Sequence, residues 1–347
     1  MRILTTKIYI HFVSFTTIVK QMKMKIIFAT LIMAIILVGS FLFFINKEES
    51  VTGKSVLQPV KVKIGYLDIA SDLSFFVALD QKYFEKYGLD VEPIKFESSN
   101  QVIDALISNK IDGTSIVALE ALLSVEEKYP DQFKVFEMTA AEKYTTVHKF
   151  LVKKDSNINH LSDLNGKTIG TYPGSQMRVF TELVLQNFID ISTINIVQMA
   201  PSLQTQALAS GQVDVLFTLE PIGTIAESKG IAKIIAVNPL YKYILKPFPT
   251  AASAFSIEFI MQNSETITRY EKAIEEAHQF IEINEKGAKQ SLPKYTTINQ
   301  EIADNVGIYS YWSKEEIDIN AVEKLIDLYI KNGIINKEVN PQNIILS

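Results

Sequence analysis

The sequence predicts an α/β protein made of two doubly wound α/β lobes, joined by two crossovers and preceded by one transmembrane helix. Three observations lead to this prediction. An uncharged apolar run lies near the start, two later stretches of the sequence resemble each other, and strand and helix patterns alternate within each of them. Strands that alternate with helices are typical of parallel βαβ units.

The composition excludes several classes of protein. The chain has 347 residues, of which 47% are hydrophobic and 21% charged, with a formal net charge of −5 and no cysteine. A chain of this length usually forms about two domains. The lack of cysteine excludes a disulfide framework, a thiolate nucleophile and Cys-ligated zinc or iron–sulfur sites. The mildly acidic balance argues against nucleic acid as a partner.

The apolar run covers residues 26–45 and reads IIFATLIMAIILVGSFLFFI, without a charge. At 1.5 Å per residue, a helix of this length crosses a hydrocarbon core of about 30 Å. Lysines precede the run and acidic residues follow it, so residues 1–25 are expected in the cytoplasm and the folded part outside. A cleaved signal peptide and a lipoprotein signal are the alternatives, but no cleavage site is clear and Ser40 stands where the lipidated cysteine is needed. A single-pass signal-anchor in the cell membrane fits best, with residues 46–59 as its linker.

Two pairs of similar segments indicate an internal duplication. The strand pattern around Gly65 resembles that around Gly170, and ALISNKID at 105–112 resembles ALASGQVD at 207–214. Each half predicts a strand, a helix (73–87 or 176–188), a second strand (91–97 or 194–199), a second helix and a third strand from Ile111 or Val213. We expect lobe 1 to comprise 60–148 plus 255–347 and lobe 2 to comprise 149–254, with a ligand cleft at the carboxyl ends of the strands.

The remainder of the chain predicts one more strand and then helices. An apolar stretch at 251–262 (AASAFSIEFIMQ) has the composition of a strand. From Ser264 the pattern is helical to the end of the chain, beginning with one apolar stripe formed by Ile267, Tyr270, Ile274, Ala277 and Ile281.

Polar residues gather in the loops that connect strand ends to helix starts, at 68–74, 98–100, 114–115 and 173–176. Hydroxyls and free backbone N–H groups at helix N-termini suit an anion or a polar head group, although ordinary helix capping explains any single loop as well. Glu220 follows the strand at 213–217. Its carboxylate either receives an N–H or ammonium group from a ligand or is a first-turn acid favoured by the helix dipole.

Motifs of enzymes are scarce. The sequence has no GxSxG, HExxH, P-loop or GxGxxG motif. Glu275, His278 and Glu282 share one helical face, as metal ligands do, but this pattern is also that of a solvated helix edge. We therefore expect no metal, no cofactor and no enzymatic activity.

The order and spacing of several motifs between residues 60 and 345 resemble one known family. These motifs are KIGY at 63–66, KYFEKYGL at 82–89, LSDLNGKTIG at 161–170, which is the most specific, and LEP at 219–221. They resemble the extracytoplasmic substrate-binding proteins of ABC importers for nitrate, alkanesulfonates, taurine and thiamine-precursor pyrimidines. Two departures stand out: Leu219 replaces a frequent tryptophan, and the lack of cysteine argues against the family's fungal pyrimidine synthases.

The resemblance implies a type II periplasmic-binding fold whose two lobes close on a small polar ligand. It also implies a monomer that delivers this ligand to ABC permease and ATPase subunits. The alternatives are a membrane-tethered ligand-sensing domain that acts through a signalling partner and, less favoured, an enzyme on the same fold. The ligand-binding positions that the resemblance implies are Leu67, Asp68, Ser71, Ser74, Ser98, Ser99, Asn100, Ser115, Gly174, Ser175, Gln176 and Glu220.

Overall fold

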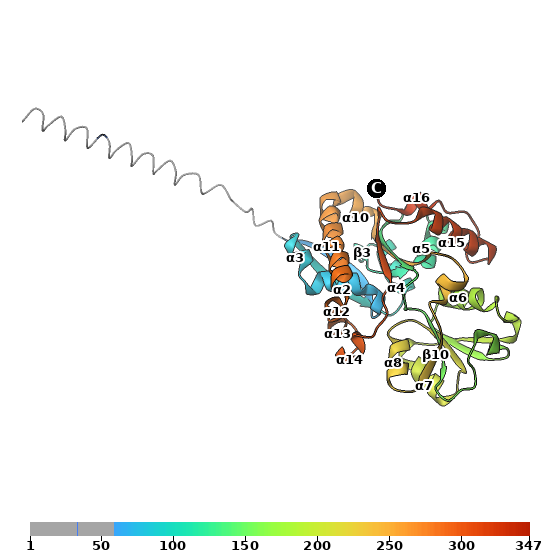
Figure 1. Cartoon of the computed structure of the whole chain (residues 1–347). Coiled ribbons are helices and arrows are strands. Elements are labelled where there is room, and N and C mark those ends of the chain that lie inside the picture. The colour runs from blue at the N-terminus through green and yellow to red at the C-terminus, as the bar shows by residue number, and fades with distance from the viewer. Residues whose placement is uncertain (1–32, 34–58) are drawn as a thin grey trace, which may run out of the picture. The chain divides into compact units, whose positions relative to one another are not determined.

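The computed structural model describes Met33 and residues 59–347. Residues 59–347 form one compact unit that contains two β-sheets (Figure 1). The predicted segments 1–25, 26–45 and 46–59 lie outside the described residues, except for Met33 and residue 59. Within the part of the chain that is described, no helix has the length and apolarity needed to cross a membrane.

The first sheet has seven strands and is mixed. β1 lies between β2 and β3 and is parallel to both, whereas β11, β5 and β12 continue the sheet in antiparallel pairs and β4 pairs with β11. The strands are β1 (Val60–Leu67), β2 (Leu89–Phe96), β3 (Gly113–Thr114), β4 (Val117–Ala118), β5 (Phe133–Ala141), β11 (Phe248–Ser256) and β12 (Ser310–Ser313).

The second sheet has five strands in the order β10-β6-β9-β7-β8. β7 is parallel to β8 and β9, and β6 and β10 complete the sheet in antiparallel pairs. The strands are β6 (Lys149–Lys153), β7 (Thr168–Thr171), β8 (Asn195–Gln198), β9 (Val215–Thr218) and β10 (Ala232–Val237).

Helices cover both faces of each sheet, so each sheet has apolar residues on both sides. On the first sheet, α2 (Leu73–Asp80), α3 (Tyr83–Lys86) and α11 (Ser264–Ile283) lie opposite α4 (Ser99–Ile107), α5 (Leu119–Lys128) and α15 (Ile319–Lys331). On the second sheet, α6 (Ser175–Leu185) and α9 (Pro239–Tyr243) lie opposite α7 (Pro201–Ser210) and α8 (Ile222–Ser228). Figure 1 shows the second group in yellow and green beneath the first.

The short helices are η1 (Ala70–Asp72), η2 (Leu161–Leu164), η3 (Ile191–Thr193), α10 (Ile257–Gln262), α12 (Glu285–Lys289), α13 (Leu292–Tyr295), α14 (Gln300–Ala303) and α16 (Pro341–Ile344).

The predicted internal duplication is confirmed by the backbone. The order β2-β1-β3 in the first sheet matches β8-β7-β9 in the second, and the three strands within each group are parallel to one another. Asp112 accepts a hydrogen bond from Lys63 N at 2.8 Å, and Asp214 accepts the equivalent bond from Thr168 N at 2.9 Å. The two similar segments therefore end their helices and start their third strands in the same way.

The structure corrects several predicted elements. The sheets are mixed, because antiparallel strands flank each parallel group. The helix expected over 73–87 divides into α2 and α3 because Lys82 adopts a left-handed conformation (φ 59°). The strand expected over 251–262 ends at Ser256, whose hydroxyl accepts a hydrogen bond from Phe259 N and caps α10. The helical tail is interrupted by β12.

The chain returns to the first sheet earlier than residue 255. β11 pairs with β5 along its whole length, beginning with Phe248 beside Ala141, so residues 248–254 belong to the first sheet. The apolar stripe of α11 is buried as predicted, at Ile267, Tyr270, Ile274, Ala277 and Ile281.

Candidate functional site

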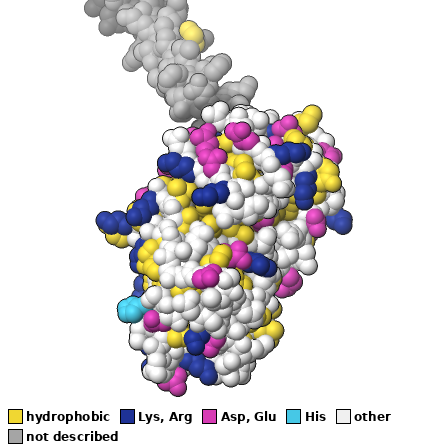
Figure 2. All heavy atoms as spheres, turned by 90° about the vertical axis from the view of Figure 1, so that its right-hand side faces the viewer, with side chains coloured by type: hydrophobic (Ala, Val, Ile, Leu, Met, Phe, Trp, Pro, Cys, Tyr) yellow, Lys and Arg dark blue, Asp and Glu magenta, His cyan; other side chains and the backbone are white. Residues whose placement is uncertain are grey.

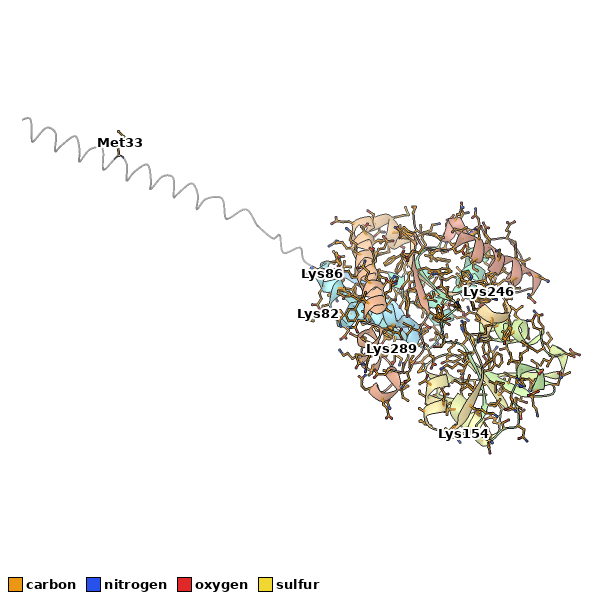
Figure 3. All side chains as sticks on the ribbon, viewed as in Figure 1. Met33, Lys82, Lys86, Lys154, Lys246 and Lys289 are labelled. Atoms are coloured by element: carbon orange, nitrogen blue, oxygen red, sulfur yellow. The ribbon has the colours of Figure 1, made fainter. Side chains whose placement is uncertain are left out.

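The carboxyl ends of the parallel strands in the two sheets meet at a junction between the lobes. Segments 142–148 and 244–247 cross this junction, and Lys246 lies close to it in Figure 3, whereas Lys154 marks the far end of the second lobe. Three hydrogen bonds join the lobes directly: Ser175 Oγ to Glu120 (2.8 Å), Gln176 Nε2 to Thr250 O (2.6 Å) and Thr224 Oγ1 to Asn305 O (3.3 Å).

The second lobe contributes the N-terminus of α6. Gly174 precedes this helix with φ +112°, a conformation that favours glycine, and its N–H donates to the Gln198 side chain at 3.1 Å. No side chain caps the helix, so its first N–H groups are available at the positive end of the helix dipole. Of the predicted residues, Gly174, Ser175 and Gln176 are therefore brought to the junction.

The loop after β1 is held from inside its own lobe by Asp72. The buried carboxylate accepts hydrogen bonds from Leu67 N (2.9 Å), Ser115 Oγ (2.6 Å) and Ile116 N (2.8 Å). Burial raises the pKa of Asp72 to about 7, although the hydrogen bonds work in the opposite direction. Leu67 and Ser115 are thus next to each other, but the Ser115 hydroxyl already donates its hydrogen bond to Asp72.

Ser74 does not face the junction with a free hydroxyl. It donates to Glu137 at 2.7 Å, and the same buried carboxylate is hydrogen-bonded by Ser253 (2.6 Å) and His278 (2.7 Å). Burial acts to raise the pKa of Glu137, but these partners hold it below its ordinary value. His278, which the sequence places on a face with Glu275 and Glu282, is therefore engaged with the core of the first lobe, and no metal-binding group of three or more such residues occurs in residues 59–347.

Glu220 is fully buried and pairs with Lys149, whose side chain is 7% exposed. Thr224 also donates to this carboxylate from its backbone N–H (3.1 Å) and its hydroxyl (2.8 Å). The residue lies at the carboxyl end of β9, as the sequence predicts, but its charge is already neutralised by a buried partner. In this conformation Glu220 has a structural role near the crossing segments, where its N–H donates to Val147 O at 3.1 Å.

The other predicted positions have mixed surroundings. Ser98 caps α4, Ser99 Oγ accepts from Ala118 N at 3.0 Å, and Asn100 is exposed. Asp68 pairs with Lys95 at 2.8 Å. Ser71 is buried, and its carbonyl accepts from Tyr311 at 3.0 Å.

A buried imidazole lies at the crossing. His148 is 2% exposed and contacts the Tyr309 hydroxyl at 3.1 Å. Burial lowers the pKa of His148 to about 3, so the ring is neutral at ordinary pH. His148, Tyr309 and Thr250 thus form a tightly packed region between the sheets.

A cavity of about 640 Å³ lies along α11 and β12. Glutamates 142, 275, 282, 285 and 316 line it together with aromatic residues of β12. None of the predicted ligand-binding residues lines this cavity, but Glu142 of the first crossing segment and Tyr309, the partner of His148, do.

Sequence reasoning missed Glu120, Lys149 and Thr250. The signal for Glu120 is present in the sequence, because it is an acid inside the apolar run ALEALL at 118–123. Lys149 and Thr250 have no local signal, since their roles depend on contacts with Glu220 and Gln176, which lie 71 and 74 positions away. On the face shown in Figure 2, basic and acidic side chains are interspersed rather than gathered by sign.

Comparisons with known proteins agree with this architecture. A binding protein of Brucella abortus (strain 2308) is 24% identical over 245 residues, which cover 70% of this chain and 73% of that protein. The alkanesulfonate-binding protein SsuA from Xanthomonas axonopodis pv. citri, solved bound to MOPS, superposes with a TM-score of 0.67 at 17% identity over 83% of this chain and 99% of its own. The periplasmic nitrate-binding protein NrtA from Synechocystis PCC 6803 gives a TM-score of 0.58 at 15% identity over 70% and 68% of the two chains.

The solved structures establish the fold, which is that of the periplasmic binding proteins. Residues 56–295 match the NMT1-like family, and this match confirms the family resemblance inferred from the sequence motifs. The chain belongs to the NMT1-like family.

Proposed function

We propose that the protein is an extracytoplasmic solute-binding protein of an ABC importer, anchored by its N-terminal segment, which captures a small polar molecule between its lobes and delivers it to a permease. The observation that carries this proposal is the junction itself. Two duplicated sheets present their strand ends to each other across two crossing segments, and hydrogen bonds from the start of α6 reach the first lobe. Such lobes can open and close around a ligand by bending at the crossings.

The names of the relatives support a binding role rather than catalysis. The Brucella abortus relative is named a "putative binding protein", and the two solved neighbours are named for binding alkanesulfonates and nitrate. These names suggest alkanesulfonates and nitrate as the first compounds to test, and the family resemblance of the sequence motifs adds taurine and aminopyrimidines.

The proposal is tested by native mass spectrometry of the purified chain, followed by a thermal-shift panel of alkanesulfonates, taurine, nitrate and an aminopyrimidine. A bound ligand at a hundredfold excess over its Kd stabilises the protein by about 2.7 kcal/mol, which a melting curve resolves. We expect at least one compound to raise the Tm without being converted. Turnover of the compound indicates an enzyme instead, and co-purification with a signalling protein rather than permease and ATPase subunits indicates a sensor.

A further inference from the structure

Glu120 is a buried carboxylate at the junction between the lobes. It lies in the first turn of α5, within an otherwise apolar run, and only 7% of the residue is exposed. Its hydrogen-bond donors are Ser175 Oγ of the second lobe at 2.8 Å and, more weakly, Ser124 Oγ of its own helix at 3.4 Å. The shorter of its hydrogen bonds is therefore one that breaks when the lobes separate.

Glu120 has no cationic partner within residues 59–347. The other buried glutamates near the strand ends each meet a basic side chain, since Glu220 pairs with Lys149 and Glu137 with His278. Arg178, the basic residue nearest in sequence to the start of α6, pairs with Glu182 of its own helix at 3.0 Å. A buried carboxylate without a counter-charge is costly, and burial accordingly raises the pKa of Glu120.

A second buried polar group of the first lobe lies on α15 and feels the charge of Glu120. The Tyr329 side chain of α15 is fully buried, and its hydroxyl makes no hydrogen bond of normal geometry. Burial, followed by the charge of Glu120, raises the pKa of Tyr329, whereas a hydrogen bond from the Gln176 side chain acts to lower it. Buried hydroxyls are normally hydrogen-bonded, so the weakly satisfied Tyr329 hydroxyl has capacity for a further partner.

These groups define the chemistry of what fits between the lobes. The uncapped start of α6 attracts an acidic group, but a bare oxyanion placed there would be repelled by the Glu120 carboxylate, which lies 2.8 Å from Ser175 Oγ at this helix start. A ligand nitrogen that carries a positive charge supplies the counter-charge that Glu120 lacks.

We propose that Glu120 is the specificity-determining carboxylate of the interlobe site and selects small molecules with a cationic nitrogen, zwitterions included, over bare oxyanions. On binding, the ligand nitrogen takes the place of Ser175 Oγ as the donor to Glu120. The acidic group of a zwitterion then lies at the start of α6. This inference rests on the proposed function, because it assigns the ligand class of that same junction.

Two matched pairs of compounds test the inference on the full chain. Taurine and isethionate share a sulfonate and differ by an ammonium or a hydroxyl group, and β-alanine and 3-hydroxypropionate differ in the same way with a carboxylate. Calorimetric titration of the wild type should give at least about tenfold tighter binding for the amine in at least one pair, because a hydrogen bond to a charged group is worth about that factor or more. Nitrate should bind more weakly than that amine.

The variant Glu120→Gln keeps an acceptor for Ser175 but removes the charge, so it should lose the preference for the amine. Glu126→Gln is the matched control, since Glu126 is equally buried on the same helix but accepts from Asp131 N, in the turn that follows α5. Equal or tighter binding of isethionate, 3-hydroxypropionate or nitrate by the wild type overturns the Glu120 inference and leaves the receptor function standing. Retention of the amine preference in Glu120→Gln overturns it as well. Failure of every compound to bind counts against both proposals.

Discussion

The two halves of the chain build the same βαβ pattern but complete their strand ends differently. After β1, the loop folds back on its own lobe, where Asp72 accepts three hydrogen bonds from Leu67, Ser115 and Ile116. After β7, the loop opens directly into α6, whose first residues bond to the opposite lobe. The polar groups after β1 are thus hydrogen-bonded within their own lobe, whereas those after β7 are hydrogen-bonded to groups of the opposite lobe.

This difference bears on the proposed binding function. The first lobe would provide groups that are held within it, and the second lobe, with its uncapped helix start, would provide groups whose contacts depend on closure. The comparison also separates residues that hold a lobe together from residues that respond to a ligand. Four substitutions or conditions test this separation, and they differ in the expected size of their effects.

The largest effect is expected at the end of β9, where the second half has a buried ion pair. The first half has Ser115 after its third strand, β3, and among residues 59–347 no such pair follows that strand. Lys149→Met leaves the carboxylate of Glu220 buried without its partner. We expect a loss of about 3–5 kcal/mol in the free energy of unfolding, measured by urea denaturation. The double variant Lys149→Met/Glu220→Leu should recover much of this loss, and a single variant as stable as the wild type would show that the pair is not the stabilising contact.

The next effect concerns the close approach of helix and strand in both halves. A Cβ added at Gly65 would lie 2.7 Å from Ile111 Cδ1, and one added at Gly170 would lie 2.9 Å from Leu216 Cδ2. Gly65→Ala and Gly170→Ala should each cost about 1–3 kcal/mol, because the neighbouring side chains must shift in a packed core. Gly166→Ala is not a suitable control, because Gly166 has φ +70° and is strained by any side chain. A large cost in one half and none in the other would contradict the equivalence of the two repeats.

The effect of pH is smaller when it is measured over a single pH unit, and it belongs to the first half only. The pKa of Asp72 is raised to about 7, above the value of an unfolded aspartate, so the folded state binds the extra proton more tightly between about pH 4 and pH 7. The stability that comes from Asp72 is therefore present below pH 4 and is lost as the pH rises to 7, by up to about 1.4 kcal/mol per pH unit.

The comparison of wild type with Asp72→Asn isolates this pH effect, because other groups titrate in both proteins. Urea unfolding at several pH values should show the advantage of the wild type over the variant shrinking from pH 5 to pH 7. A constant difference would mean that Asp72 stays ionised, held by its three hydrogen-bond donors.

The sequence patterns predicted the two repeats, but they did not predict the contacts between the repeats. The similar motifs around Gly65 and Gly170, together with the alternation of strands and helices, predicted two sets of parallel βαβ units, because these patterns are local features of the sequence. The antiparallel strand β12 and the early return at Phe248 were missed, since both are fixed by pairing with β5 far away in sequence. In the same way, Glu220 was recognised at a strand end, but its partner Lys149 was not, because the pair forms only when β6 lies beside β9.

The smallest effect tests whether the two halves unfold together. Asp112 and Asp214 each accept a backbone N–H at equivalent places, so Asp112→Ala and Asp214→Ala should each cost about 1 kcal/mol. Asp90→Ala, an exposed position on β2, is the control and should change stability by less than about 0.5 kcal/mol.

The single tryptophan of the chain, Trp312, lies in β12 of the first lobe, so its fluorescence reports the unfolding of that lobe. One apolar cluster contains residues of both sheets, such as Val135 and Phe217, and this continuity favours unfolding as one unit. Asp214→Ala should therefore shift the Trp312 transition in urea as much as Asp112→Ala does, although it lies in the other lobe. If Asp214→Ala moves the circular-dichroism transition but leaves the Trp312 transition in place, the lobes unfold separately. The junction then adds little to stability without a ligand, and closure depends on the molecule bound there.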